Sequence, residues 1–172
     1  MRPSAWPLIV AVGGALSLGA CASMEATPDQ LMPPGNPDGA PQPIADHDWF
    51  LDSDPDAASL VYGRVESDDV WLTLSCLRGS GRLELMRPAD ADRQPVIYLE
   101  SGGETERFTG RVEASELFEH GEVIAEASTT PPVFQRFRRL GWLGLHDADG
   151  RALMVAHPAS SGGVERFFAF CG

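Results

Sequence analysis

The strongest constraint on the fold is a repeated alternation of apolar and polar side chains between residues 59 and 156. Successive side chains of a β-strand point to opposite faces, so a period of two indicates strands that bury one face. The close spacing of these segments predicts a mainly β domain, an antiparallel β-sandwich or small barrel of about eight strands. The predicted strands are 59–65, 70–76, 82–87, 96–100, 105–112, 122–127, 142–146 and 151–156.

Glycine-rich segments between these strands predict turns. They are Gly79-Ser80-Gly81, the hairpin Ser101-Gly102-Gly103-Glu104, and Asp147-Ala148-Asp149-Gly150. After the first of these turns, we expect Leu83 and Leu85 to face the core and Arg87 to face solvent.

Two segments show helical spacing instead. The apolar residues of 133–140 follow a Pro-Pro pair and precede Gly141, which predicts a short helix. The apolar residues of 160–171 predict a second short helix, with Ser160 or Ser161 as its N-cap. Two glycines in its first turn weaken this helix, and a strand is the alternative.

The composition excludes several kinds of chemistry. The chain has 172 residues, 13 of them basic and 25 acidic, with a formal net charge of −12. All the basic residues are arginines, so reactions that need a lysine, such as Schiff-base formation, are excluded. The acidic balance argues against nucleic acid as a partner held by charge. The length allows one domain of ordinary size.

Residues 1–20 have the layout of a signal peptide. Arg2 precedes an apolar run over 8–18, which is shorter than the roughly 20 apolar residues that a membrane-spanning helix needs. The next motif, Leu18-Gly19-Ala20-Cys21, resembles the lipobox of bacterial lipoproteins. This resemblance implies acylation of Cys21 and a lipid anchor in the membrane, whereas an ordinary signal peptide cleaved nearby is the alternative. In the sorting rule of such lipoproteins, Ala22 implies the outer membrane, on its periplasmic side.

Residues 21–45 are expected to comprise the acylated cysteine and a disordered, Pro-rich tether, because almost no large apolar side chain is present to build a core. The single β-rich domain is then expected to span 46–172. It begins with a cluster of acidic residues over 46–56, in which His47 is expected at the surface. The cluster lacks the spacing of a calcium loop, so we expect a solvated acidic face and no metal.

The two cysteines that remain, Cys76 and Cys171, are predicted to form a disulfide in an oxidising compartment. The alternative is a thiol nucleophile beside His120 or His157, but neither cysteine lies in a sequence context typical of such sites. No Gly-x-Ser-x-Gly motif occurs, and the histidines lack metal-ligand spacing. We therefore expect no cofactor and predict that the protein is not an enzyme.

Two features are candidates for binding a partner. One is the hairpin tip Ser101-Gly102-Gly103-Glu104. The other is the basic cluster Arg136, Arg138 and Arg139, on the polar side of the first predicted helix. Arginine forks bind carboxylate or phosphate groups, such as those of peptidoglycan or lipopolysaccharide. The simpler interpretation is a solvated helix face balanced by nearby glutamates.

Two resemblances concern the folded part. Val61-Tyr62-Gly63, Ser67-Asp68-Asp69-Val70, Leu74-Ser75-Cys76 and Phe167-Phe168-Ala169-Phe170-Cys171 resemble segments of small exported Gram-negative lipoproteins of unknown function. A fainter similarity links the chain to the lipoprotein inhibitors of C-type lysozyme, which are small, lipid-anchored, β-rich and disulfide-bonded. Their Ser-Gly-x-x-Tyr loop is half matched, because Ser101-Gly102 is present but Thr105 replaces the tyrosine.

These features predict a lipoprotein of the cell envelope with a non-catalytic binding or structural role. An envelope protein and peptidoglycan are the expected kinds of partner. An inhibitor of a cell-wall hydrolase such as lysozyme is the alternative. An enzyme that uses Glu104 and Glu106 as carboxylate catalysts is a third interpretation.

Overall fold

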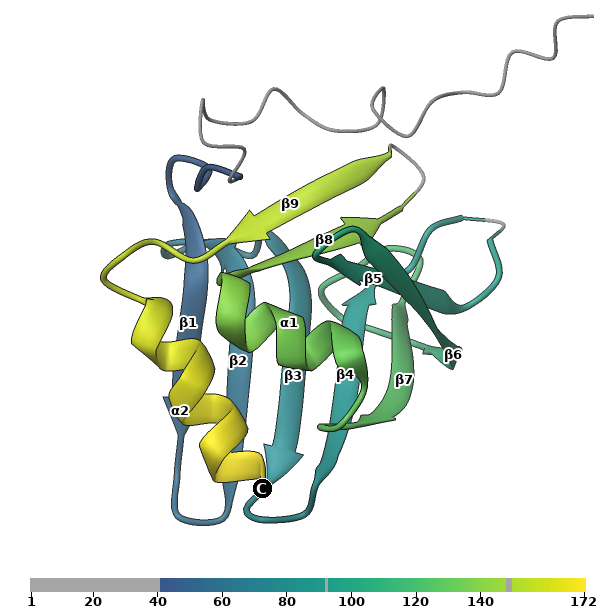
Figure 1. Cartoon of the computed structure of the whole chain (residues 1–172). Coiled ribbons are helices and arrows are strands. Elements are labelled where there is room, and N and C mark those ends of the chain that lie inside the picture. The colour runs from purple at the N-terminus through teal and green to yellow at the C-terminus, as the bar shows by residue number, and fades with distance from the viewer. Residues whose placement is uncertain (1–40, 92, 148–149) are drawn as a thin grey trace, which may run out of the picture. The chain divides into compact units, whose positions relative to one another are not determined.

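The computed structural model describes residues 41–91, 93–147 and 150–172 (Figure 1). The predicted signal peptide, Cys21 and most of the predicted tether lie outside these ranges. The described part contains nine strands and two helices. They are β1 (His47–Ser53), β2 (Ala57–Arg64), β3 (Val70–Leu77), β4 (Arg82–Pro88), β5 (Val96–Ser101), β6 (Glu104–Glu113), β7 (Glu122–Ser128), α1 (Pro132–Leu140), β8 (Trp142–His146), β9 (Arg151–Val155) and α2 (Ser161–Cys171).

The strands form one antiparallel sheet in the order β1-β2-β3-β4-β7-β6-β5-β8-β9. The two ends of this order approach each other, because Trp49 Nε1 in β1 donates a hydrogen bond to the Met154 carbonyl in β9. The sheet is therefore nearly closed, like a barrel. The predicted fold class, mainly β with two short helices, is confirmed.

β1 is the strand that the sequence analysis missed. His47, Trp49 and Leu51 point inward along it, while Phe50 and Asp52 point outward. Inward and outward side chains alternate along β1, as in any strand. The acidic residues among them made this segment look like a solvated face in the sequence. Inside the described part, no three acidic, histidine or cysteine side chains are grouped so that they could hold a metal.

Asp54 shows what one of these acidic residues does in the turn between β1 and β2. Its Oδ1 accepts hydrogen bonds from the backbone N–H groups of Asp56 and Ala57. These bonds lower the pKa of Asp54 below its ordinary value. The carboxylate therefore stabilises the turn.

Both helices lie on the same side of strands β1 to β4 (Figure 1). α1 buries Val133, Phe134 and Phe137. It ends at Gly141, where a φ of 76° places the glycine N–H in reach of the Phe137 carbonyl. The predicted helix and its glycine stop are confirmed.

α2 is also a helix, and it begins after Ser160, one of the two predicted N-cap residues. Ser160 occupies the N-cap position without a side-chain capping bond. Its hydroxyl donates instead to Asp48 Oδ1, which also accepts from the backbone N–H groups of Trp49 and His157. The Asp48 carboxylate thus ties the start of α2 to β1.

The predicted disulfide is present. Cys76 in β3 and Cys171 in α2 are joined, with Cα atoms 5.7 Å apart and a sequence separation of 95. The N–H groups of Gly79 and Gly81 donate to the carbonyls of Phe170 and Cys171. The end of α2 is thus fixed to the β3–β4 turn by a covalent bond and two hydrogen bonds.

Candidate binding sites

The predicted hairpin tip joins β5 to β6 and lies against α1. Gly102 and Gly103 have φ values of 66° and 86° and form the two-residue turn that the sequence predicted. Arg136 Nε donates to the Ser101 carbonyl, and its Nη1 lies 2.8 Å from Glu104 Oε2. Two of the predicted binding features therefore meet, but they neutralise each other within the domain.

Ser101 is not available to a partner. Its side chain is fully buried, and its hydroxyl donates to the Trp142 carbonyl at 3.0 Å. A Cβ on Gly102 would stand 2.8 Å from Arg136 Cδ, so the glycine permits the close approach of the arginine. A hydrolase that contacted this hairpin would have to use residues 102–105, which are exposed.

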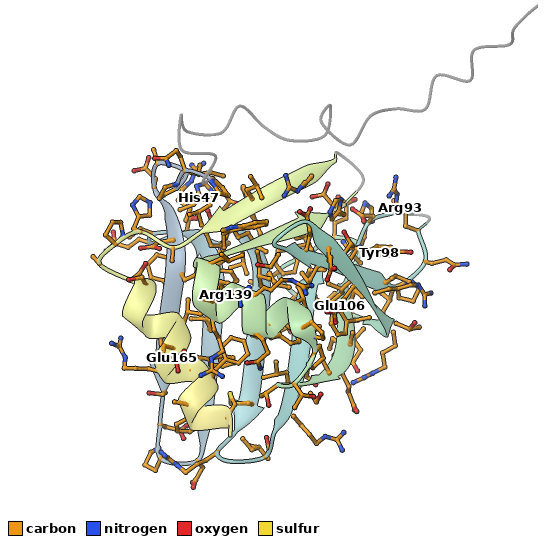
Figure 2. All side chains as sticks on the ribbon, in the orientation of Figure 1. His47, Arg93, Tyr98, Glu106, Arg139 and Glu165 are labelled. Atoms are coloured by element: carbon orange, nitrogen blue, oxygen red, sulfur yellow. A yellow bond between two sulfur atoms is a disulfide. The ribbon has the colours of Figure 1, made fainter. Side chains whose placement is uncertain are left out.

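The other two arginines of α1 have different surroundings. Arg138 Nε lies 3.0 Å from Glu165 Oε2 in α2. This hydrogen bond raises the pKa of Arg138 and lowers that of Glu165. Arg139 is exposed and has no acidic partner among the residues described (Figure 2). The three arginines do not form one anion-binding surface, because glutamates pair with Arg136 and Arg138.

Two neighbouring hollows lie elsewhere, at the end of the barrel where β3, β5 and β9 begin and β4 and β8 end. We call this end the barrel mouth. A first hollow of about 420 Å³ and a second of about 350 Å³ open there. Both are lined by Arg87, Asp90 and Asp147, so they adjoin. Each volume falls in the range of small-molecule pockets, roughly 300 to 1,000 Å³.

Arg87 separates the two hollows, and the expectation that it faces solvent is wrong. It follows the inward parity of Leu83 and Leu85, and only 5% of the residue is exposed. Its Nη2 donates to the Val96 carbonyl at 3.3 Å and lies 3.0 Å from Asp90 Oδ2. The charge can be buried because it is paired and hydrogen-bonded. Its Nε is also buried and has no hydrogen-bond partner within the described ranges.

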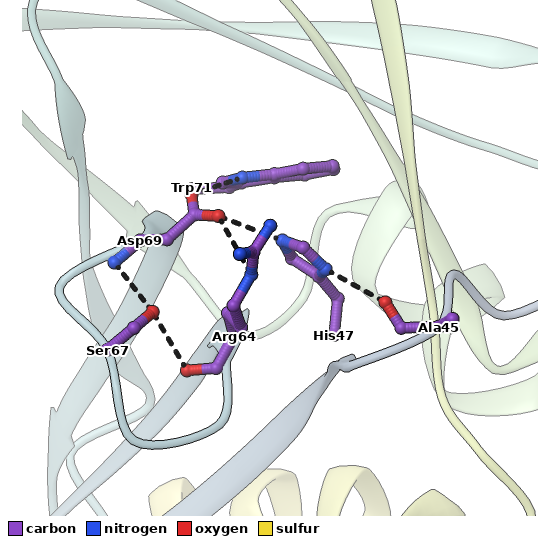
Figure 3. Close-up of polar contacts among 6 residues, drawn as sticks. All are labelled: Ala45, His47, Arg64, Ser67, Asp69 and Trp71. Carbon is purple, nitrogen blue, oxygen red and sulfur yellow. Dashed lines mark hydrogen bonds and ion pairs between the residues drawn. The ribbon is translucent and has the colours of Figure 1, made fainter.

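The first hollow has a preorganised aromatic wall. Trp71 lines it and donates its Nε1–H to Asp69 Oδ1 at 2.9 Å (Figure 3). The other oxygen of Asp69 contacts His47 Nε2 at 3.1 Å and Arg64 Nε at 3.6 Å. The imidazole also stacks near the indole, with ring centroids 4.8 Å apart. Asp69 thus fixes the Trp71 side chain at the hollow.

His47 therefore belongs to the structure of the barrel mouth. The expectation of a surface histidine is wrong, because only 5% of the residue is exposed. It is the first inward-pointing residue of β1, and its Nδ1 contacts the Ala45 carbonyl at 3.2 Å. Ordered contacts thus extend back into the last residues of the predicted tether.

The second hollow is supported by a hydrogen-bonded triad of Glu100, His146 and Arg151. Glu100, 9% exposed, contacts His146 Nε2 at 3.2 Å through Oε2 and accepts a hydrogen bond from Arg151 Nη2 at 2.7 Å through Oε1. Gly144 leaves room for this arrangement, because a Cβ there would lie 3.3 Å from Arg151 Nε. The triad fixes the imidazole of His146, which lines the hollow beside Tyr98.

The two hollows differ in their polar groups. Both contain the carboxylates of Asp90 and Asp147. The first adds Asp68, Asp69 and the rings of Trp71 and Phe118, while the second adds the side chains of Arg93, Gln94, Tyr98 and His146. Acceptors, donors and aromatic surfaces together suit a polar ligand that has hydroxyl groups and apolar faces. None of these residues was singled out from the sequence, although the parity of β4 would have revealed Arg87.

Neither described helix is long and apolar enough to cross a membrane. Comparisons with protein family models, with curated proteins and with solved structures find no match to this chain.

Proposed function

We propose that the protein is a lipid-anchored lipoprotein of the outer membrane that faces the periplasm and has a non-catalytic binding role. The lipobox-like motif that ends at Cys21 supports the anchor. We further propose that the first hollow of the barrel mouth binds the carbohydrate chain of an envelope polymer, peptidoglycan.

The observation that carries the binding role is the arrangement of Trp71 beside Asp68 and Asp69 in a hollow of about 420 Å³. A sugar ring presents an apolar face that packs on an aromatic ring, and its hydroxyl groups donate to carboxylates. Because Asp69 already holds the indole, little side-chain freedom is lost when a ligand binds.

Sedimentation of the full acylated chain in detergent with purified peptidoglycan tests this function. We expect Trp71→Ala to reduce the bound fraction at least about fivefold, since it removes a stacking surface worth roughly 1 kcal/mol. Phe50→Ala is the matched control, because Phe50 is an exposed aromatic residue that points outward from β1. Near-ultraviolet circular dichroism would verify that both variants fold.

Failure of the wild type to sediment, or equal sedimentation of Trp71→Ala, would contradict the proposal. If the wild type instead retained lysozyme, and substitutions within 102–105 abolished this, the inhibitor interpretation would replace it.

A further inference from the structure

We infer that the second hollow is a carboxylate subsite of the same binding site, so that the ligand is an acidic saccharide lying across both hollows. The inference rests on the proposed carbohydrate-binding function. It adds the charge of the ligand and the direction in which it lies. Because the muramic acid carboxyl of intact peptidoglycan is amide-linked to the stem peptide, the ligand is a stretch of glycan whose muramic acid has lost that peptide.

The two hollows adjoin at a shared wall. Arg87, Asp90 and Asp147 line both of them, so a ligand long enough to pass this wall contacts both hollows. The buried Nε–H of Arg87 is a donor without a partner in the part of the chain described. A polar ligand at this junction would supply the missing acceptor.

Arg93 supplies a cation to the second hollow. It is exposed, and no acidic side chain of the described residues pairs with it. Asp90 and Asp147 line the same hollow, and Asp90 is already paired with Arg87 at 3.0 Å. Figure 2 shows Arg93 at the same end of the molecule as Tyr98, whose residue is 40% exposed. A carboxylate is the natural partner of such a guanidinium.

His146 adds a second group to this hollow. Its Nε2 contacts Glu100, whose carboxylate is also bound by Arg151. This leaves Nδ1 without a partner among the described side chains. Tyr98 lies opposite His146 in the β5–β8 register, so the two side chains share one face of the sheet. Arg93 and Tyr98 thus present donors to a ligand carboxylate, and His146 Nδ1 can accept a hydrogen bond from a neighbouring hydroxyl group of the ligand.

The two hollows therefore impose an orientation. Hydroxyl groups of the saccharide face Asp68 and Asp69 near Trp71, where a carboxylate would be repelled. The carboxylate of the saccharide faces Arg93 and the Tyr98 hydroxyl group. A neutral saccharide would bind the first hollow alone.

Calorimetric titration of the full acylated chain tests the subsite. The probes are the disaccharide of N-acetylglucosamine and N-acetylmuramic acid and the methyl ester of the same disaccharide. We expect the acid to bind about tenfold more tightly than the ester, because a charge-assisted hydrogen bond contributes about 1.4 kcal/mol or more. The Arg93→Gln variant should bind the acid and the ester with about equal affinity, and its affinity for the ester should match that of the wild type.

Arg166→Gln is the matched control, because Arg166 is an exposed arginine in α2 that lines neither hollow. It should keep the full preference for the acid. Galacturonic acid disaccharide and its methyl ester distinguish a uronic acid source from a muramic acid source. A preference for either acid over its ester that Arg93→Gln abolishes supports the subsite.

Equal affinity for acid and ester in the wild type would overturn the subsite and leave the carbohydrate-binding function standing. A preference that persists in Arg93→Gln would overturn it as well. If no saccharide bound, and peptidoglycan did not retain the protein, the proposed function itself would fail together with the subsite.

Discussion

Arg87 donates a hydrogen bond from Nη2 to the carbonyl of Val96 and so joins β4 to β5, which lie three places apart in the sheet order. The bond crosses the barrel mouth rather than following the sheet. The same guanidinium pairs with Asp90. One side chain therefore holds together the walls of both hollows.

Arg87→Met should lower the free energy of unfolding by about 3 kcal/mol, because it leaves a partly buried carboxylate unpaired. The double variant Arg87→Met with Asp90→Leu should regain most of this loss, since neither charge remains. Urea unfolding of the wild type, both single variants and the double variant measures the coupling. If Arg87→Met were as stable as the wild type, Arg87 would not support the barrel mouth.

Gly110 in β6 is a position where any side chain should be costly. A Cβ there would stand 2.2 Å from the Ile124 carbonyl oxygen in β7. We expect Gly110→Ala to lower stability by about 2 to 3 kcal/mol through backbone displacement. Gly162→Ala in α2 is the contrasting control, because its nearest neighbour is the flexible Arg166 side chain, and it should raise stability by up to about 1 kcal/mol. Similar thermal midpoints for the two variants would contradict this expectation.

The ion pair between Arg138 and Glu165 predicts a small pH dependence. The hydrogen bond from Arg138 lowers the pKa of Glu165 below its ordinary 4.5. Its contribution to stability is therefore fully present above about pH 4.5 and is lost as the pH falls through the lower pKa of the folded state.

Because the Glu165 side chain is 58% exposed, the contribution should be only about 0.5 kcal/mol. Glu165→Gln should lower stability by this amount at pH 7 and have no effect at pH 2, as measured by chemical denaturation. Glu119→Gln, at an exposed site outside any ion pair in the described residues, should have no effect at either pH. An equal loss at both pH values would show that the hydrogen bond does not depend on the ionised carboxylate.

Cys171→Ser should destabilise the domain by about 4 kcal/mol, because the disulfide closes a loop of 95 residues. Cys76→Ser and the double variant should lose the same amount, since all three remove one bond. Denaturant unfolding measures the loss, and alkylation of the denatured, unreduced wild type should detect no thiol at either position. Stoichiometric alkylation there would contradict the pairing.

Cys21→Ser should abolish lipid attachment, because the thioether requires the cysteine sulfur. Metabolic labelling with a palmitate analogue measures the attachment, and Cys171→Ser should remain labelled. Labelling of the Cys21→Ser chain at the wild-type level would leave the lipobox-like motif without that role.

The sequence predicted the fold better than the site. Alternation located eight strands, and a Pro-Pro pair with Gly141 bounded α1, because these signals are local along the chain. β1 was missed although His47, Trp49 and Leu51 alternate correctly, since its outward positions include acidic residues. The acidic residues of β1 thus hid the alternation of its inward-pointing side chains.

The candidate site could not be predicted in the same way, because its parts come from distant segments. Asp69 meets His47 across 22 residues, and Glu100 meets Arg151 across 51 residues. Such contacts depend on which strands are neighbours, and one sequence does not specify that order. The helix arginines, by contrast, were visible in the sequence, but their glutamate partners were not identifiable before α1 was placed beside β6 and α2.

If the chain is exported as proposed above, the long interval between the bonded cysteines affects the order in which their thiols become available. Cys76 would then reach an oxidising compartment 95 residues before its proper partner Cys171 and after Cys21. The loop between Cys21 and Cys76 is the shorter one, so its closure is entropically easier. Acylation of Cys21, as proposed above, converts that thiol to a thioether and removes the competing partner. Lipid attachment would then prevent a non-native disulfide between Cys21 and Cys76, in addition to anchoring the chain.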